Sequence, residues 1–209
     1  MTAGRYFVLD GPDGCGKSTQ AGDLVAWLRA QGADVLHLRE PGSTPVGEAL
    51  RHLLLSPTTG ELLPLTEALL FTAARAELVA RVIAPALARG TVVIAERCYT
   101  STLAYQSLAL PAATALPLPF VFGLTQQAHG STMPEAVFVL DVAPEVAEHR
   151  RRARTDDRIE ARGADYHARV RAAFAGLAAH DPRVLVIDAN RARDDVQDEL
   201  RARVQERLR

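Results

Sequence analysis

The sequence predicts an α/β protein in which helices cover both faces of one doubly wound sheet of five parallel strands. Three observations carry this prediction. Five short segments are rich in β-branched or aromatic residues and nearly continuous in hydrophobicity, as in parallel strands buried on both faces. Helical segments separate them, and a glycine-rich loop follows the first. The expected strands are residues 6–10, 34–38, 91–95, 136–141 and 184–188.

The helices are expected between the strands, so that the chain forms successive strand–helix–strand units. The first helix has Ala21, Leu24, Val25 and Leu28 on one stripe, which would face the sheet. A ligand is expected at the carboxyl ends of the strands. The predicted helices are residues 19–30, 46–55, 66–88, 101–109, 144–152, 166–179 and 194–208.

The chain of 209 residues suits a single domain spanning 1–209, with a core of useful size. Residues 111–119 are rich in proline and alanine. No second core follows them that lacks the strands of the sheet, so we expect a surface loop within the one domain.

Composition excludes several classes of protein. The net charge of −1 gives no overall attraction to nucleic acid or to an acidic membrane, and neither is expected as a partner. No apolar stretch has the length of a membrane span, and the N-terminus does not resemble a signal peptide. Cys15 and Cys98 lie in motif regions, which indicates reduced thiols and a cytoplasmic protein.

The loop after the first strand fits G-x-x-x-x-G-K-[ST], and it holds Lys17, the only lysine of the chain. Its glycines let backbone N–H groups point at a polyphosphate, and the next helix begins there. Lys17, expected as an exposed ammonium, would bridge phosphates, and Ser18 would ligate Mg²⁺. The alternative is a glycine-rich turn that happens to hold a lysine. The predicted ATP-binding residues are Gly11, Pro12, Asp13, Gly14, Cys15, Gly16, Lys17, Ser18 and Thr19.

Cys15 lies two residues before Lys17 within this loop. Because the ammonium and the N–H dipoles of the loop are close by, we expect them to favour the thiolate of Cys15. The alternative is a small residue chosen to fit the loop.

Polar residues also follow the second and third strands. Residues 39–44 form a Pro-Gly turn that is either a plain turn with solvated charges or part of a site. Glu96 and Arg97 follow the third strand, where a carboxylate could assist Mg²⁺ and a guanidinium could hold a phosphate. The alternative is a surface ion pair. Their position at the ligand edge of the sheet favours the functional interpretation.

Two further groups are ambiguous from their residues alone. Phe71 and Arg75 lie four apart on a helix and could clamp a nucleobase, or be a core ring and a solvated cation. The arginines at 150, 151, 152 and 154 precede a charged segment. They form either a solvated face or a mobile lid near residues 150–160 that closes on phosphates.

Taken together, these motifs resemble the thymidylate kinase family, from Tyr6 to about Asp188. The phosphate loop alone is shared by a large superfamily, and the Arg-Glu-Pro-Gly turn combined with Ala-Tyr-Gln is more specific. The segments that carry the resemblance, besides the loop, are Arg39-Glu40-Pro41-Gly42-Ser43-Thr44, Leu70-Phe71-Thr72-Ala73-Ala74-Arg75, Glu96-Arg97, Ser101-Thr102-Leu103-Ala104-Tyr105-Gln106 and Asp157-Arg158-Ile159-Glu160.

The resemblance implies roles in binding deoxythymidine monophosphate (dTMP). Arg97 would hold its phosphate, Phe71 would stack on thymine, and Arg75 would hydrogen-bond a thymine carbonyl. Tyr105 would lie beneath the sugar at C2′ and exclude ribose, and Asp13 would meet the 3′-hydroxyl. The implied dTMP-binding residues are Asp13, Phe71, Arg75, Arg97, Thr102, Tyr105 and Gln106.

The resemblance also implies the nucleoside-monophosphate-kinase form of the P-loop fold, a homodimer, and transfer of the ATP γ-phosphoryl group to dTMP. Mg²⁺ would be the cofactor, near Ser18 and Glu96. The bacterial type, in which the lid supplies the catalytic arginine, is implied. The catalytic residues would be Lys17, Arg97, Arg150 and Arg154.

Two other classes stay open: a kinase for another small molecule, and a nucleotide-dependent switch. The chain also departs from the family pattern. Glu96 stands where the family commonly has Asp, Asp10 where it has Glu, and Ser107 where it has Gly. Residues 108–134 match poorly, and no substrate contact is assigned there.

Overall fold

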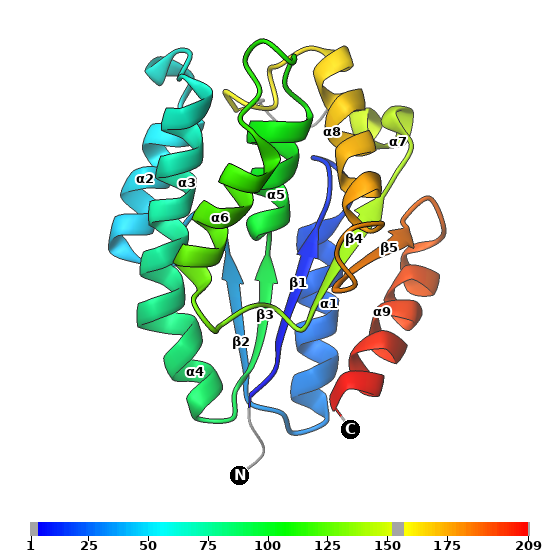
Figure 1. The fold of residues 1–209 in the computed structure, drawn as a ribbon. Helices are drawn as coiled ribbons and strands as arrows, with labels where there is room; N and C mark the ends of the chain where they lie inside the picture. Colours follow the sequence, from blue (N-terminus) through cyan, green and yellow to red (C-terminus); the bar gives the residue numbers. More distant parts are fainter. Residues whose placement is uncertain (1–3, 152–156, 209) are drawn as a thin grey trace.

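The computed structural model describes residues 4–151 and 157–208, and its centre is a parallel sheet of five strands in the order β2-β3-β1-β4-β5 (Figure 1). All five predicted strands are confirmed, two of them one residue later than predicted. Every pair of neighbours is parallel. The strands are β1 Tyr6–Asp10, β2 Val35–Arg39, β3 Val92–Glu96, β4 Ala136–Asp141 and β5 Val184–Asp188.

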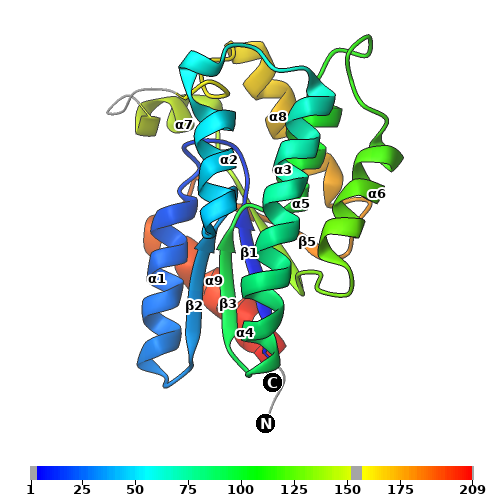
Figure 2. The ribbon, with the colours of Figure 1, turned by 90° about the vertical axis from the view of Figure 1, so that its left-hand side faces the viewer.

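Helices cover both faces of the sheet, as Figure 2 shows from the side. One face packs against α1 (Lys17–Ala30) and α9 (Arg193–Leu208). The other face packs against a larger group of helices: α3 Pro64–Leu78, α4 Ala84–Ala88, α5 Tyr99–Leu103, α6 Leu118–His129 and α8 Ala164–Leu177. At the carboxyl ends of the strands lie α2 Pro45–Leu55 and α7 Pro144–Arg151 (Figure 1).

Alternate residues of each strand enter two separate cores. In β1, Phe7 and Leu9 pack with α1 and α9, whereas Tyr6 and Val8 pack with the opposite helices. All five residues of β1 are buried, which explains why the segment is apolar without alternation. The buried sheet fixes the carboxyl ends of β1, β2 and β3 side by side. No helix in residues 4–151 and 157–208 has the length and apolar character needed to cross a membrane.

The helix predicted over residues 66–88 is interrupted. After α3, a π-helical turn at Val79–Ile83 (η2) leads into α4. Pro85 lacks an N–H group, and its ring would clash with the carbonyl of Arg81 in a regular α-helix. A wider turn before the proline removes this conflict. The helix predicted over residues 101–109 likewise continues from α5 into a π-helical turn at Ala104–Leu108 (η3).

A helix that the sequence analysis did not predict, α6, follows the exposed loop at residues 111–116. Prolines at 117 and 119 suggested irregular structure. Pro119 lies in the first turn of α6, where an N–H group has no partner within the helix and a proline is tolerated. Val121 of α6 is buried in the core shared with α3 and α5.

Candidate active site

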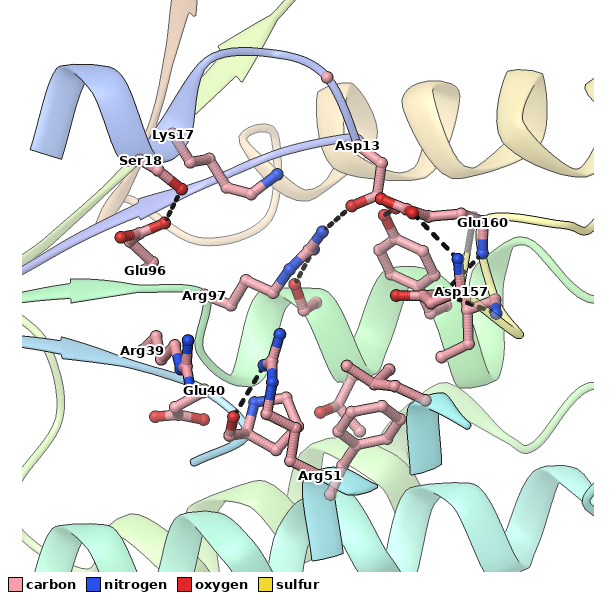
Figure 3. A pocket seen from close by; sticks show the side chains of 18 of the residues that line it. Asp13, Lys17, Ser18, Arg39, Glu40, Arg51, Glu96, Arg97, Asp157 and Glu160 are labelled. Carbon is pink, nitrogen blue, oxygen red and sulfur yellow. Dashed lines mark hydrogen bonds and ion pairs between the residues drawn. The ribbon is translucent and has the colours of Figure 1, made fainter. Parts of the chain in front are cut away.

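A cavity of about 860 Å³ opens at the carboxyl ends of β1, β2 and β3 (Figure 3). Among the predicted site residues, Gly11, Pro12 and Cys15 do not line it, and Arg154 lies outside the described residues. All the others do: Asp13, Gly14, Gly16, Lys17, Ser18, Thr19, Phe71, Arg75, Glu96, Arg97, Thr102, Tyr105, Gln106 and Arg150.

The loop between β1 and α1 has the backbone shape that its glycines allow. Gly11 and Gly14 have φ values of 129° and 82°, which side chains disfavour. A Cβ atom on Gly14 would also lie 2.5 Å from the carbonyl oxygen of Ala147. Lys17 is buried rather than exposed, and its Nζ donates hydrogen bonds to the carbonyl oxygens of Gly11 (3.0 Å) and Pro12 (2.8 Å). The backbone carbonyl oxygens of the loop therefore hold the ammonium inside the loop.

The prediction that Cys15 favours its thiolate is wrong. The side chain is buried, and burial raises the pKa of the thiol although Lys17 and Arg97 act in the opposite direction. Lys17 Nζ lies 3.6 Å from the sulfur, but it is bonded to two carbonyl oxygens. In this chain Cys15 serves as a small packing residue beneath the loop.

Ser18 and Glu96 meet on one side of the cavity, as Figure 3 shows. The Ser18 hydroxyl donates to Glu96 Oε2 at 2.5 Å, and His37 Nε2 lies 3.1 Å from Glu96 Oε1. Burial would raise the pKa of Glu96, but the hydrogen bonds with His37 and Ser18 outweigh burial and lower it. Glu96 is thus an ionised carboxylate beside the hydroxyl of the loop.

Asp13 and Arg97 lie across the cavity from Ser18 and Glu96 (Figure 3), and Tyr105 joins them through a hydrogen bond to Asp13. Arg97 Nη2 donates to Asp13 Oδ1, and the Tyr105 hydroxyl donates to Asp13 Oδ2 at 2.9 Å. Burial alone would raise the pKa of Asp13, but the charges of Arg97 and Lys17 lower it to about 2. Arg97 has a φ of 71°, an uncommon value for a residue with a side chain.

Arg97 is also supported from beneath by Asp10, which is fully buried at the end of β1. Asp10 accepts hydrogen bonds from Thr100 (2.5 Å) and Ser101 (2.7 Å), and Ser101 in turn accepts one from Arg97 at 3.1 Å. These bonds tie the start of α5 to β1. Asp10 therefore fixes the segment that carries Arg97 and does not itself line the cavity.

Arg75 is a buried guanidinium at the far end of the cavity, with a relative exposure of 2%. Its Nε donates to Glu40 Oε2 at 2.7 Å, and its Nη1 donates to Thr102 Oγ1 at 3.0 Å. Phe71 lies one helical turn before it on α3 and also lines the cavity. Phe71 and Arg75, whose role was ambiguous from the sequence, thus face the same cavity, and Glu40 holds the guanidinium of Arg75 in place.

Gln106 is held by a second buried carboxylate. Its Nε2 donates to Glu67 Oε2 at 3.1 Å. Glu67 Oε1 accepts from Arg158 (2.7 Å) and Arg162 (2.5 Å), which follow the segment that the structure does not describe. Arg158 Nε also donates to the carbonyl oxygen of Leu54 at the end of α2. These contacts fix the segment from which Asp157, Ile159 and Glu160 line the cavity.

Arg150 comes from α7 and reaches the outside of the phosphate loop. Its guanidinium lies 3.4 Å from the carbonyl oxygens of both Cys15 and Ala189. It lines the cavity near Gly16, whose Cβ position would be 3.7 Å from Arg150 Nη1. Of the expected lid near residues 150–160, the structure describes the side chains of Arg150 and of residues 157–160, and the arginines at 152 and 154 lie outside the described residues.

Comparison with known proteins identifies the family. The model of the thymidylate kinase family matches residues 9–200. This chain belongs to the thymidylate kinase family. It is 43% identical over 204 residues to a thymidylate kinase from Symbiobacterium thermophilum, covering 97% of this chain and 94% of that protein. Its identity to a Deinococcus radiodurans thymidylate kinase is 41% over 209 residues, with 99% of each covered.

A solved thymidylate kinase has the same fold. The crystal structure of the enzyme from Ehrlichia chaffeensis aligns with a TM-score of 0.78 and 27% sequence identity. The alignment covers 98% of this chain and 99% of that one. The resemblance seen in the sequence motifs and the P-loop kinase fold that it implied are thereby confirmed.

Sequence reasoning did not single out Arg51, and it left Arg39 open as part of a plain turn or of a site. Arg39 and Arg51 line the cavity beside Arg97, and Figure 3 labels all three. Arg51 lies on α2, and its Nη1 donates to the carbonyl oxygen of Pro41 at 2.9 Å. Burial lowers the pKa of Arg51, and Arg39 lowers it further. The available signal was a cation on the helix that follows the Pro-Gly turn.

Proposed function

We propose that this chain transfers the γ-phosphoryl group of ATP to the 5′-phosphate of dTMP, giving the diphosphate, as a single kinase unit of residues 1–209. One observation carries the proposal. The phosphate loop, the buried Arg75 and the partly buried Phe71 face the same cavity, which the cations Arg51 and Arg97 also line. A donor nucleotide on the loop and an acceptor nucleotide on the pair would therefore meet phosphate to phosphate.

On the donor side, residues 11–19 would bind ATP. The amides of the loop and the amino end of α1 would hold the phosphates. Lys17 would turn from the carbonyl oxygens of Gly11 and Pro12 to the outer phosphate oxygens of ATP. Because this ammonium is already inside the loop, little reorganisation is required when the nucleotide binds.

The side chains of Ser18 and Glu96 suit a Mg²⁺ site. Hydroxyl, carboxylate and phosphate oxygens with a few waters are the ligands that this ion prefers. Within the described residues no cluster of three or more acidic, histidine or cysteine side chains could hold a metal alone, so the nucleotide would complete the site. When bound, Mg²⁺ would offset the negative charge of the outer phosphates. Ser18 would be a ligand through its hydroxyl oxygen, and Glu96 would accept the hydrogen bond that this hydroxyl donates.

On the acceptor side, Arg97 and Arg51 would hold the 5′-phosphate of dTMP. Arg75 would donate to a thymine carbonyl, with Phe71 stacked on the ring and Thr102 and Gln106 along its edge. Tyr105 would pack beneath C2′ of the sugar, and Asp13 would accept from the 3′-hydroxyl. Each of these side chains lines the cavity: Asp13, Arg51, Phe71, Arg75, Arg97, Thr102, Tyr105 and Gln106.

Transfer then requires orientation and charge stabilisation more than acid–base chemistry. The acceptor is a phosphate oxygen that is already anionic near neutral pH, so a strong general base is not needed. The cavity would align the two phosphates, and Lys17 and Arg97 would stabilise the charge spread over the transferring group. Arg150 and Arg154 would add the guanidinium of the lid that the bacterial type uses.

A homodimer and a cytoplasmic location complete the proposal. Leucines at positions 63, 65 and 69, in and just before α3, are 74%, 44% and 47% exposed. An apolar face of this kind marks a contact surface, and a two-fold pair would bury it against itself. Light scattering that gives twice the chain mass for wild type and the single-chain mass for Leu69→Glu would support the dimer. A wild-type monomer at micromolar concentration would contradict it.

A coupled assay of diphosphate formation tests the activity. We expect ATP to be consumed only when a nucleoside monophosphate is present, with dTMP preferred over dUMP and over ribonucleotides. Turnover of ATP without an acceptor would point to a nucleotide-dependent switch. A preference for a different acceptor would point to another small-molecule kinase.

A further inference from the structure

Glu96 has a partner on the neighbouring strand that no motif of the family assigns. Glu96 stands where the family commonly has Asp, so its carboxylate is one methylene further from the backbone. Its two oxygens have different partners: Oε2 accepts from the Ser18 hydroxyl at 2.5 Å, and Oε1 lies 3.1 Å from His37 Nε2. A continuous chain of side chains therefore runs from the phosphate loop through β3 to β2.

The register of the sheet places His37 for this contact. In the parallel pair β2–β3, His37 lies opposite Ile94, and Arg39 lies opposite Glu96. His37 and Glu96 are thus diagonal neighbours on the same face, the face that packs against α1. Because α1 begins with Lys17 and Ser18, this face also presents Ser18 to Glu96. The side chains of His37 and Glu96 are only 32% and 17% exposed, so the contact is partly shielded from water.

We propose that His37 is a positioning residue for the magnesium site. It holds the Glu96 carboxylate so that Oε2 accepts the hydrogen bond of the Ser18 hydroxyl. The Ser18 oxygen would then keep its lone pairs available as a ligand for the cation. A glutamate has one more side-chain torsion than an aspartate, and without a second hydrogen bond the carboxylate would turn away from Ser18 in part of the molecules. Substitution of a residue that hydrogen-bonds to a metal site from behind typically lowers metal affinity or activity by about 10- to 100-fold.

This inference rests on the proposed function, and in particular on the magnesium site at Ser18. The experiment therefore measures metal binding directly. The full chain, saturated with ADP, is titrated with Mn²⁺ as a spectroscopic substitute for Mg²⁺, and the free ion is followed by electron paramagnetic resonance. Affinity for metal-free ADP, measured in EDTA, reports separately on the loop.

We expect His37→Ala to weaken Mn²⁺ binding about tenfold or more, with metal-free ADP affinity and melting temperature nearly unchanged. His37→Gln should stay within about twofold of wild type, because its amide nitrogen reaches the same place as Nε2 and can donate to Glu96. His180→Ala is the matched control, an exposed histidine in the turn after α8 that does not line the active-site cavity. It should leave Mn²⁺ binding unchanged.

A double-mutant cycle separates the hydrogen bond from other effects of the imidazole. Glu96→Asp withdraws the carboxylate from His37, so His37→Ala should change affinity less than about twofold in that background. Unchanged Mn²⁺ affinity in His37→Ala, equal losses in His37→Ala and His37→Gln, or full additivity in the cycle would each overturn the inference. Ser18→Ala tests the magnesium site itself. If it binds Mn²⁺ as wild type does, the site fails and the inference with it; a loss in Ser18→Ala alone overturns only the role of His37.

Discussion

The phosphate loop and the wall formed by α3, α5 and η3 face the same cavity, but they are positioned in different ways. The loop takes its shape from backbone: glycines with positive φ, carbonyl oxygens around Lys17 and the first turn of α1. The wall takes its shape from buried pairs of side chains. Glu40 holds Arg75, and Glu67 holds Gln106 together with Arg158.

This difference has an energetic consequence. The side chain of Lys17 can be removed without leaving a buried charge unpaired, because the partners of its ammonium are backbone carbonyl oxygens. A side chain of the wall cannot, because its partner remains in a site that water hardly reaches. We therefore expect loop variants to lose activity while keeping their stability, and wall variants to lose both.

The largest effect on activity is expected from Lys17→Ala. Removing a pre-positioned donor from a phosphate site should lower kcat/KM by about 10²- to 10³-fold. Because the glycines and α1 keep the loop in place, the melting temperature should change little and dTMP binding should persist. Steady-state kinetics, calorimetry of dTMP binding and thermal denaturation measure the three quantities. Near-normal turnover in a folded variant would contradict both the site and the comparison.

The largest effect on stability is expected from Arg75→Ala. It leaves the carboxylate of Glu40 buried without a cation, which costs about 3–5 kcal/mol of unfolding free energy. Arg81→Ala is the matched control on the same helical segment, since its partner Glu77 forms an exposed pair. Such surface pairs contribute about 1 kcal/mol or less. Urea denaturation of both variants measures the free energy of unfolding. Equal losses of this free energy would show that the wall is not held by its buried charges.

A smaller effect, on pH dependence, is expected from Asp13, where the loop and the wall touch. Its pKa is about 2 in the folded chain against an ordinary 3.8. A lowered pKa adds stability above the unfolded value, and that stability, about 2 kcal/mol, is lost as pH falls from about 4 to 2. The unfolding free energy of Asp13→Asn should therefore fall less steeply over this range. Glu61→Gln, at an exposed acid, should follow the wild type; identical slopes in all three would contradict the lowered pKa.

The smallest effect is expected from Tyr105, and it concerns selectivity. The ring packs against Tyr166 and Phe174, with centroids 6.3 and 6.0 Å away, while the hydroxyl binds Asp13. Tyr105→Phe keeps the ring and should keep the preference for deoxyribose. Tyr105→Ala should relax that preference about tenfold. The ratio of kcat/KM for deoxy- and ribonucleotides measures this, and a constant ratio in the alanine variant would refute steric exclusion at C2′.

The sequence predicted the loop in more detail than the wall, because the loop is fixed by neighbouring residues and the wall by distant ones. The loop is local: its spacing, its glycines and Lys17 lie within one octet, and the strand and helix around it were placed within two residues. The wall depends on contacts between distant residues. Glu40 and Arg75 are 35 positions apart, and Glu67 and Arg158 are 91 apart. No periodicity marks such pairs, so Glu67 was not singled out at all.

The incorrect predictions came from the local preferences of single residues, which packing in the folded chain overrides. Lys17 and Cys15 were expected to be an exposed ammonium and a thiolate, but packing beneath the loop buries both. Pro119 suggested a loop, although its place in the first turn of α6 costs nothing. Pro85 went unnoticed inside a predicted helix, and the chain accommodates it with a π-helical turn.

The solitary lysine also makes the chain unusual as a chemical target. Every other basic side chain is an arginine or a histidine. Reagents that acylate amines therefore find one side chain besides the terminal amino group, and its Nζ lies among the carbonyl oxygens of the loop. Acylation and a nucleotide would compete for the same nitrogen. Beyond the increment from the terminal amino group, a second mass increment on the intact protein would then report the fraction of molecules whose loop is empty, without a substrate or turnover.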